Sequence, residues 1–433
     1  MGILDKIAKR RNNDEPVLIE GGKAIYVPDI QSSKQKYIED TIKAGDVVIL
    51  IGDYDLLSIT SLLHLIDLKA IIVPLYKNNI TDIEYNIKVT SADYIIQNNQ
   101  ITNLKNDSSK HDLIKELTAK KNPGIIFFST GTTGKPKAIL HDVTLLFKRF
   151  ETPRPALKSI NFLMFDHMGG LNTLFHTIFN GGTIINPLNR NPEYILKLVS
   201  KYKIELLPTT PTFLRMLLLS GLLPDSVPSC LKIISYGSEQ MDEVTLKTFC
   251  NILPNIDFRQ TYGLSEFCVL RAKSKSKESL FFKVGGEGMD VKIEDSFLKL
   301  RSKYRMVGYL NAKDPFDKNG WYNTKDIVQE DGEYIKIVGR ETEIVNVGGL
   351  KFMLSEINNV ALEFPGVSDV RSFAKSNPIT GQHVEILVEI KDKNLFNTKK
   401  LKNYFELKLP NHMRPQKIKI GKININHRFK KIN

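Results

Sequence analysis

Short apolar runs alternate with segments of helical period along most of this chain, and this order constrains the fold more than any other feature. Residues 47–51 predict a buried strand, residues 57–65 carry leucines at helical spacing, and residues 70–73 predict the next strand. The same order recurs between residues 194 and 235. A strand–helix–strand order predicts a parallel sheet covered by helices. We therefore expect an α/β fold in which ligands bind at the loops that follow strands.

The pattern changes after about residue 344. Residues 367–373 and 384–390 predict strands, and residues 399–409 predict an amphipathic helix. From Lys391 to the end there are 13 lysines and arginines against two acidic residues, although the whole chain has a net charge of only +13. We predict a large N-terminal domain over residues 1–340 and a small, basic α+β domain over residues 341–433.

Composition excludes several classes of protein. The hydrophobic fraction of 42% is too high for a disordered chain, and three cysteines without a C-x-x-C pair indicate neither a disulfide framework nor a zinc site. The nearly neutral first 390 residues argue against a protein that coats nucleic acid. Residues 1–13 are charged and lack the apolar core typical of a signal peptide, and charged residues interrupt the most apolar region, residues 47–76. We therefore expect no signal peptide, no membrane span and a cytoplasmic location.

A loop rich in hydroxyls, glycine and lysine follows the predicted strand at residues 124–128. Its members are Ser129, Thr130, Gly131, Thr132, Thr133, Gly134, Lys135, Pro136 and Lys137. Hydroxyls, backbone N–H groups and two ammonium groups suit a polyphosphate, and glycine permits close backbone approach. The loop is not a Walker A motif, which has glycine at position 129 and serine or threonine at position 136.

This loop resembles the phosphate loop of the adenylate-forming superfamily, which includes acyl-CoA synthetases and the adenylation domains of peptide synthetases. Further motifs resemble that family in the family's order: Gly237-Ser238-Glu239, Gln260 to Glu266, Gly320 to Asp326, Gly339-Arg340 and Gly348-Gly349. The resemblance covers most of the chain and implies a large domain of sheets flanked by helices, with a small mobile C-terminal domain.

The resemblance also implies a chemistry: a carboxylic acid and ATP give an acyl-adenylate, whose acyl group passes to a thiol. Glu266 is expected to associate with Mg²⁺, Tyr262 to stack on adenine, and Asp326 and Arg340 to bind the ribose or phosphates. The implied nucleotide-binding residues are Ser129, Thr130, Gly131, Thr132, Thr133, Gly134, Lys135, Lys137, Gly237, Ser238, Glu239, Tyr262, Gly263, Ser265, Asp326 and Arg340.

The acid is expected near His167, Gly237 and Gly263, because Phe165 to Gly170 resembles the acyl-CoA synthetase segment. Asp166 keeps open the branch that activates amino acids, in which an aspartate binds the substrate amine. Thr130, Glu266 and a terminal lysine are the expected catalytic residues. The terminal lysine is Lys430 if Phe429 replaces the family's glycine, or Lys431 in the alternative register. The domain hinge is expected at Thr342.

Ala138, Lys325 and Phe429 stand where the family usually has glycine. If position 325 needs a positive φ, lysine there costs about 1–2 kcal/mol. The function expected is ligation of a carboxylic acid to coenzyme A or to the phosphopantetheine of an acidic acyl carrier protein. Both acceptors are acidic, so the basic C-terminal region would attract either of them. The alternatives are a nucleotide-binding protein without catalysis, an amino-acid-activating enzyme and, least favoured, a nucleic-acid binder. The oligomeric state is not specified by the sequence.

Overall fold

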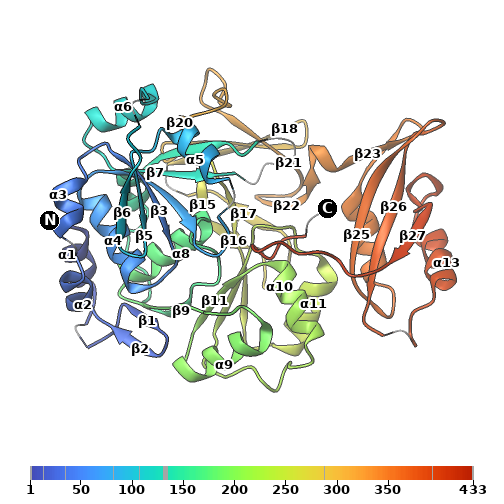
Figure 1. Cartoon of the computed structure of the whole chain (residues 1–433). Coiled ribbons are helices and arrows are strands. Elements are labelled where there is room, and N and C mark those ends of the chain that lie inside the picture. The colour runs from blue at the N-terminus through green and yellow to red at the C-terminus, as the bar shows by residue number, and fades with distance from the viewer. Residues whose placement is uncertain are drawn as a thin grey trace.

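The structure is a computed structural model that describes residues 2–431 except 13, 35, 81, 107, 130–134, 287 and 393. Two seven-stranded sheets form most of the large N-terminal part (Figure 1). The first has the order β20 (Gly308–Tyr309), β8 (Ala138–Asp142), β7 (Gly124–Phe128), β4 (Ile71–Tyr76), β3 (Val47–Gly52), β5 (Tyr94–Gln97), β6 (Gln100–Asn103). The second has the order β13 (Asp257–Gln260), β12 (Ile233–Tyr236), β11 (Leu206–Thr209), β9 (Lys158–Ile160), β10 (Thr183–Ile185), β1 (Leu18–Glu20), β2 (Lys23–Ile25).

The predicted strand–helix–strand units are present in both sheets. Strand β3 pairs in parallel with β4 across helix α4 (Leu56–Asp67), and β11 pairs in parallel with β12 across α10 (Pro211–Leu219). The sheets are parallel in their centres, while β2, β6, β8 and β20 add antiparallel edges. The sequence pattern did not reveal these edges, because short strands in hairpins carry no crossover helix.

Helices lie between and around the two sheets. Helices α4 and α8 (Met168–Phe179) contribute to one apolar core with residues of both sheets, among them Leu50 of β3 and Ile184 of β10. The remaining helices are α1 (Ile3–Ala8), α2 (Val27–Ser32), α3 (Lys36–Thr41), α5 (Ile83–Thr90), α6 (Asp112–Ala119), α7 (Val143–Lys148), α9 (Pro192–Tyr202), α11 (Glu243–Ile252), α12 (Leu354–Leu362) and α13 (Thr398–Lys408). None of the helices in the described part of the chain is both long and apolar enough to cross a membrane.

Local signals in the sequence set several helix starts. Asp55 caps α4 by accepting a hydrogen bond from the Ser58 N–H, and Thr210 caps α10 by accepting one from the Phe213 N–H. Pro211 occupies the first position of α10, where a missing N–H costs nothing. These caps place the polar ends of the helices at the carboxyl ends of β3 and β11.

An antiparallel hairpin and sheet complete the large part. The hairpin joins β14 (Tyr262–Leu264) to β15 (Cys268–Leu270). The sheet has the order β16 (Ala272–Ser274), β17 (Phe282–Val284), β22 (Tyr334–Arg340), β21 (Tyr322–Asp331), β19 (Phe297–Ser302), β18 (Met289–Glu294).

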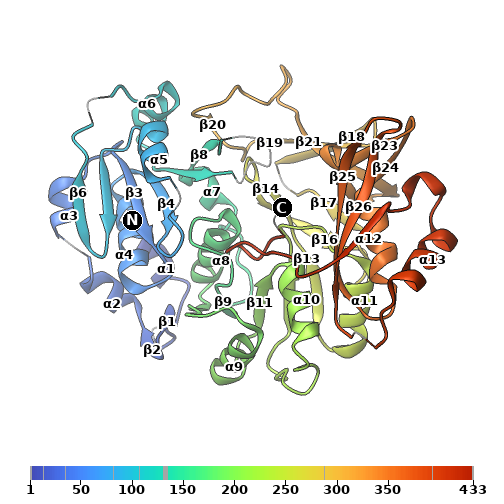
Figure 2. The same cartoon turned by 45° about the vertical axis from the view of Figure 1, so that its right-hand side comes forward.

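The C-terminal part has its own sheet and core. Its strands are β24 (Leu350–Met353), β23 (Ile344–Val347), β26 (Gly381–Ile390), β25 (Val367–Asn377) and β27 (Lys417–Ile420). The core of this part joins buried residues of β23, β25 and β26 to Ile357 of α12 and Phe405 of α13. A 3₁₀ turn, η1 (Glu341–Glu343), connects it to β22, and a second, η2 (Asn411–Met413), follows α13. After β27 the chain runs back to the large part (Figures 1 and 2).

The start of α8 is packed too tightly for any side chain at Gly170. A Cβ there would lie 2.1 Å from Tyr54 Oη and 2.3 Å from the Met164 carbonyl oxygen. We predict that Gly170→Ala lowers the free energy of unfolding by about 2 kcal/mol through overpacking, measured by urea denaturation. Gly421→Ala is the matched control, because its Cβ would come no closer than 3.3 Å to Leu387. Equal midpoints for the two variants would contradict the packing described.

Candidate functional site

The predicted phosphate loop joins two antiparallel strands, β7 and β8. Its ends are closed by two bonds: the Ser129 N–H donates to the Lys137 carbonyl at 3.0 Å, and the Lys137 N–H donates to Ser129 Oγ at 3.0 Å. The Lys137 ammonium lies 4.8 Å from the ring centroid of Tyr309. The expected residues Thr130, Gly131, Thr132, Thr133 and Gly134 lie outside the described residues. The loop is thus presented by a hairpin, and not by the strand-to-helix turn of a Walker A motif.

Glu266 lies in the turn between β14 and β15, close to the end of this loop. Tyr309 Oη donates to Glu266 Oε1 at 2.5 Å. Burial, together with the negative charge of Glu266, raises the pKa of Tyr309, so the phenol remains a hydrogen-bond donor. The Tyr309 ring therefore links Lys137 on one face to Glu266 at its hydroxyl.

The residues around Glu266 fit a magnesium ion that is held mainly by phosphate. Among the described residues, no group of three or more histidine, cysteine or acidic side chains could enclose a metal ion. Mg²⁺ commonly takes one or two carboxylates and completes its shell with substrate phosphates and water. A single carboxylate beside a phosphate loop meets that requirement.

Tyr262, Asp326 and Arg340 form one hydrogen-bonded group. Tyr262 Oη donates to Asp326 Oδ2 at 2.6 Å, and Arg340 Nε donates to Asp326 Oδ1 at 2.8 Å. Asp326 and Arg340 face each other in register on β21 and β22, and the Asp326 residue is only 3% exposed. The motifs around residues 262, 326 and 340 are distant in sequence, yet the structure brings their polar atoms together.

Lys325, beside this group, has a φ of 63°. This is the left-handed conformation that glycine adopts readily, so the lysine accepts a strain of about 1–2 kcal/mol. The Lys325 N–H donates to Asn323 Oδ1, and its ammonium pairs with Glu341 at 2.9 Å. The backbone at this position thus keeps a conformation suited to glycine, and Asp326 remains placed against Arg340.

The turn at Gly237–Glu239 follows β12. A Cβ on Gly237 would lie 2.2 Å from Thr261 Oγ1, so this position tolerates only glycine. Glu239 uses both carboxylate oxygens within the protein: Oε2 accepts from Thr212 Oγ1 at 2.7 Å, and Oε1 accepts from the Lys431 N–H at 3.2 Å. Glu239 therefore ties the end of the chain to the start of α10.

His167 caps helix α8. Its Nδ1 accepts a hydrogen bond from the Gly169 N–H at 3.0 Å. Burial lowers the pKa of His167 well below 6.5, and the positive charges of Lys430, Arg428 and His427 lower it further. The imidazole is therefore neutral at physiological pH, and it lines a narrow space together with Ser238 and Lys430.

Lys430 and Lys431 point to different places. Lys431 Nζ donates to Asp369 Oδ1 at 2.5 Å and to the Val370 carbonyl oxygen at 2.9 Å, both on β25 of the small domain. Lys430 lines the narrow space with His167 and Ser238, as do its neighbours Arg428 and Phe429. Among the described residues the ion pairs of this segment are formed by Arg428 and Lys431, and none by Lys430. The structure thus directs Lys430 towards the site and Lys431 away from it.

Several residues at the site were not recognised from sequence. Arg428 Nη2 donates to Asp166 Oδ2 at 2.6 Å, and Arg215 pairs with both Asp242 at 3.0 Å and Asp369 at 3.4 Å. These partners are separated by up to 262 residues. No periodicity or motif signals such pairs, because only the folded chain brings them together.

Thr342, the expected hinge residue, lies in η1. This turn separates the last strand of one sheet, β22, from the first strand of the C-terminal sheet, β23. The Arg340 N–H donates to Glu343 Oε2 at 3.0 Å across the turn. Arg340 and the expected hinge are therefore adjacent in the structure.

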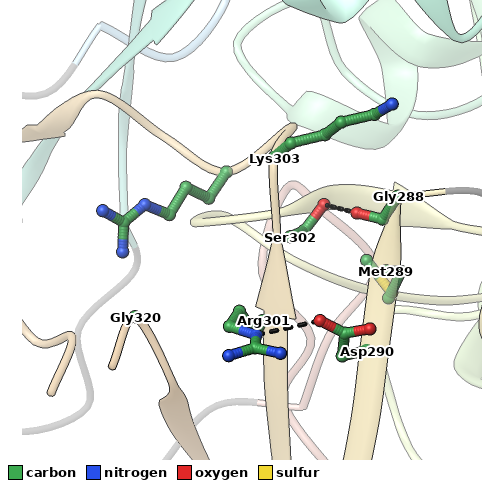
Figure 3. A pocket seen from close by; sticks show the side chains of 8 residues that line it. Gly288, Met289, Asp290, Arg301, Ser302, Lys303 and Gly320 are labelled. Atoms are coloured by element: carbon green, nitrogen blue, oxygen red, sulfur yellow. Dashed lines mark hydrogen bonds and ion pairs between the residues drawn. The ribbon is translucent and has the colours of Figure 1, made fainter. Parts of the chain in front are cut away.

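A separate cavity of about 480 Å³ lies at the end of the β18–β19 hairpin (Figure 3). Arg301 Nε donates to Asp290 Oδ2 at 2.8 Å across it, and Ser302 Oγ donates to the Gly288 carbonyl oxygen at 3.0 Å. It contains none of the predicted site residues. Arg301 and Asp290 pair with each other, while Lys303 and Arg305 add two further cations to its lining.

Comparison with known proteins identifies the family. Residues 24–296 match the family described as AMP-binding enzyme, and the chain belongs to that family. The resemblance inferred from the motifs and the predicted α/β fold are therefore confirmed, and the chain is an enzyme of this family.

Individual proteins agree with this assignment. A 2-succinylbenzoate–CoA ligase of Staphylococcus epidermidis is 26% identical over 332 residues, which are 71% of this chain and 68% of the relative. Other relatives are matched over 58% and 62% of their length, which is less than two thirds.

Solved structures share the fold. An anthranilate CoA ligase in complex with anthranoyl-AMP superposes with a TM-score of 0.81 at 15% identity, covering 100% of this chain and 95% of that one. ATP-bound MatB from Rhodopseudomonas palustris also gives 0.81, at 16% identity, covering 99% and 97%.

The protonation of Lys430 predicts a pH dependence. Burial lowers its pKa from 10.5 to about 8; Glu239 opposes this shift, and the cations Arg428 and Arg340 add to it. The ammonium is charged below that pKa and is lost as pH rises through about 8, so ATP affinity should fall over that interval. Calorimetric titration of ATP at a series of pH values measures this. Lys430→Arg should retain its affinity for ATP above pH 8, because guanidinium stays charged. If ATP affinity depended on pH in the same way in the wild type and in this variant, the role given to Lys430 would be contradicted.

Proposed function

We propose that this protein is an ATP-dependent acid–thiol ligase that joins a carboxylic acid to coenzyme A through an acyl-adenylate. The observation that carries the proposal is that residues of separate motifs lie together: Tyr262, Asp326 and Arg340 are joined by hydrogen bonds, and Lys430 lines one space with His167. The relatives and neighbours named above as CoA ligases support the same reaction class.

The first step overcomes the poor reactivity of a carboxylate. A carboxylate oxygen attacks the α-phosphorus of ATP, the bond to the bridging oxygen breaks, and pyrophosphate leaves. Two anions must meet, so the site has to supply positive charge and fixed orientation. Lys430, Lys135 and Lys137 supply charge, and magnesium beside Glu266, when bound, would neutralise phosphate oxygens.

The nucleotide is held by the remaining groups. Asp326 accepts hydrogen bonds, and its carboxylate would bind the two ribose hydroxyls while Arg340 and Tyr262 fix its orientation. Tyr262 packs against Phe282 with ring centroids 5.8 Å apart, which holds the ring where it would lie along the adenine. The turn at Gly237–Glu239 would contact the base, since Gly237 has no side chain to obstruct it.

The second step transfers the acyl group. The thiol sulfur attacks the carbonyl carbon, the carbon–oxygen bond to AMP breaks, and the thiol proton passes to solvent. We propose that the small domain, residues 341–433, rotates about Thr342 between the steps to withdraw Lys430. Its basic helix α13, with Lys399, Lys400 and Lys402, would attract polyanionic coenzyme A or an acidic carrier protein.

The arrangement of Asp166 argues against an amino-acid substrate. Its carboxylate is paired with Arg428, so the charge that would bind an α-ammonium group is already compensated. The departures from glycine do not argue for loss of catalysis either. Lys325 and Phe429 both adopt positive φ values, 63° and 54°, and so keep the backbone path that glycine would follow.

The proposal predicts acid-dependent exchange of labelled pyrophosphate into ATP by the purified full-length chain. A panel of aliphatic and aromatic carboxylic acids, with Mg²⁺ present, is assayed with and without each acid. At least one acid should stimulate exchange, and mass spectrometry of that reaction should detect its acyl-AMP. No stimulation across the panel, with ATP binding intact, would favour a nucleotide-binding protein without catalysis.

Assays of the two half-reactions distinguish the role of Lys430 from that of Lys431. Lys430→Ala should reduce pyrophosphate exchange by about 100-fold or more, as expected for loss of a charge on reacting phosphates, but should spare thioester formation from a supplied acyl-adenylate. Lys431→Ala is the neighbouring control and should have the smaller effect on exchange, because its ammonium binds Asp369. The reverse order would assign the catalytic role to Lys431.

A further inference from the structure

The end of the chain forms a strap that enters the large domain. We define the C-terminal strap as residues 426–431, which follow β27 and run from the small domain to the large one (Figures 1 and 2). A short turn shapes it: the Asn426 N–H donates to the Lys430 carbonyl at 2.8 Å, and Asn426 Oδ1 accepts from the Lys430 N–H at 3.0 Å. This turn points its central residues into the large domain.

Arg428 ties the strap to the segment before α8. Arg428 Nη2 lies 2.6 Å from Asp166 Oδ2, and the two side chains are only 12% and 11% exposed. Charge-assisted bonds of this kind are short and strong when shielded from water. Removal of either partner would leave a poorly solvated charge, which is strongly unfavourable.

Phe429 provides a second, apolar attachment. Its ring centroid lies 5.0 Å from that of Phe162 and 5.9 Å from that of Phe213, and its carbonyl oxygen accepts from Thr210 Oγ1 at 3.1 Å. Its φ of 54° is unfavourable for a residue with a side chain. The ring contacts therefore hold a backbone conformation that phenylalanine would otherwise avoid.

The position of Lys430 depends on both attachments. Lys430 directly follows Phe429 and lies two residues after Arg428, so its backbone is fixed by contacts that involve no phosphate. Asp166 and Phe162 belong to the same segment, residues 160–167, which also carries His167. One segment of the large domain thus holds the strap and lines the space that receives Lys430.

We propose that Arg428 and Phe429 are positioning residues that latch the strap to Asp166, Phe162 and Phe213 and so hold Lys430 in the site for adenylation. The proposal rests on the function proposed above. The latch adds a requirement: the Arg428–Asp166 pair must open whenever Lys430 leaves the site.

The test uses the full-length protein and three variants: Arg428→Ala, Phe429→Gly and the charge exchange Arg428→Asp with Asp166→Arg. Phe429→Gly removes the whole side chain, relieves the strain of the positive φ and gives the backbone more freedom. Hydrogen–deuterium exchange of the strap peptide reports attachment without any substrate. Pyrophosphate exchange and thioester formation from supplied acyl-adenylate report the two half-reactions, and Lys115→Ala, which breaks an exposed pair with Asp112, is the control.

The latch predicts that strap exchange rises by about tenfold or more in Arg428→Ala and Phe429→Gly, and that pyrophosphate exchange falls while thioester formation changes little. The charge exchange should recover part of the loss, and Lys115→Ala should match the wild type. Unchanged strap exchange, or an equal fall in both half-reactions, would overturn the latch. If the wild type supports no acid-dependent exchange, the proposed function fails, and strap exchange alone decides the latch.

Discussion

Three cations, Arg428, Lys430 and Lys431, enter the site region within a stretch of four residues, and the structure depends on how their charges are compensated. Arg428 is paired with Asp166 and Lys431 with Asp369, whereas Lys430 has no ion-pair partner among the described residues. Asp166 belongs to the large domain and Asp369 to the small one, so the two ion pairs attach the strap to both domains. The middle ammonium is then left available for an anion, and its pKa is lowered by burial and by the nearby cations Arg428 and Arg340, against the opposing charge of Glu239.

The rest of the site is organised in the same way, with each group that would touch the nucleotide fixed by a second protein group. Asp326 is held by Tyr262 and Arg340, Glu266 by Tyr309, and the phosphate loop by reciprocal bonds between Ser129 and Lys137. Preorganisation of this kind reduces the reorganisation needed when charge develops. The same bonds join residues from strands far apart in the chain, such as Tyr262 and Asp326.

Much of this was predictable from the sequence. The buried strands at residues 47–51 and 124–128 and the strand–helix order between residues 194 and 235 were recognised by apolar period, and ordered motifs indicated the family. Three features could not be predicted: the antiparallel edges, the partner of Arg428 and the apolar contacts of Phe429. Each of them depends on residues that only the fold brings together. The choice between Lys430 and Lys431 was open in sequence, since adjacent residues differ only in which way the folded backbone points them.

If the strap holds Lys430 for adenylation, then Lys430, and neither of its cationic neighbours, contacts the phosphates of bound ATP. A crystal structure of the full-length protein with ATP and magnesium tests this most directly. We expect Lys430 Nζ within hydrogen-bond distance of a nucleotide phosphate, with the Arg428–Asp166 and Lys431–Asp369 pairs intact. A structure in which Lys431 or Arg428 has left its carboxylate to bind the phosphates, with Lys430 directed elsewhere, would contradict it.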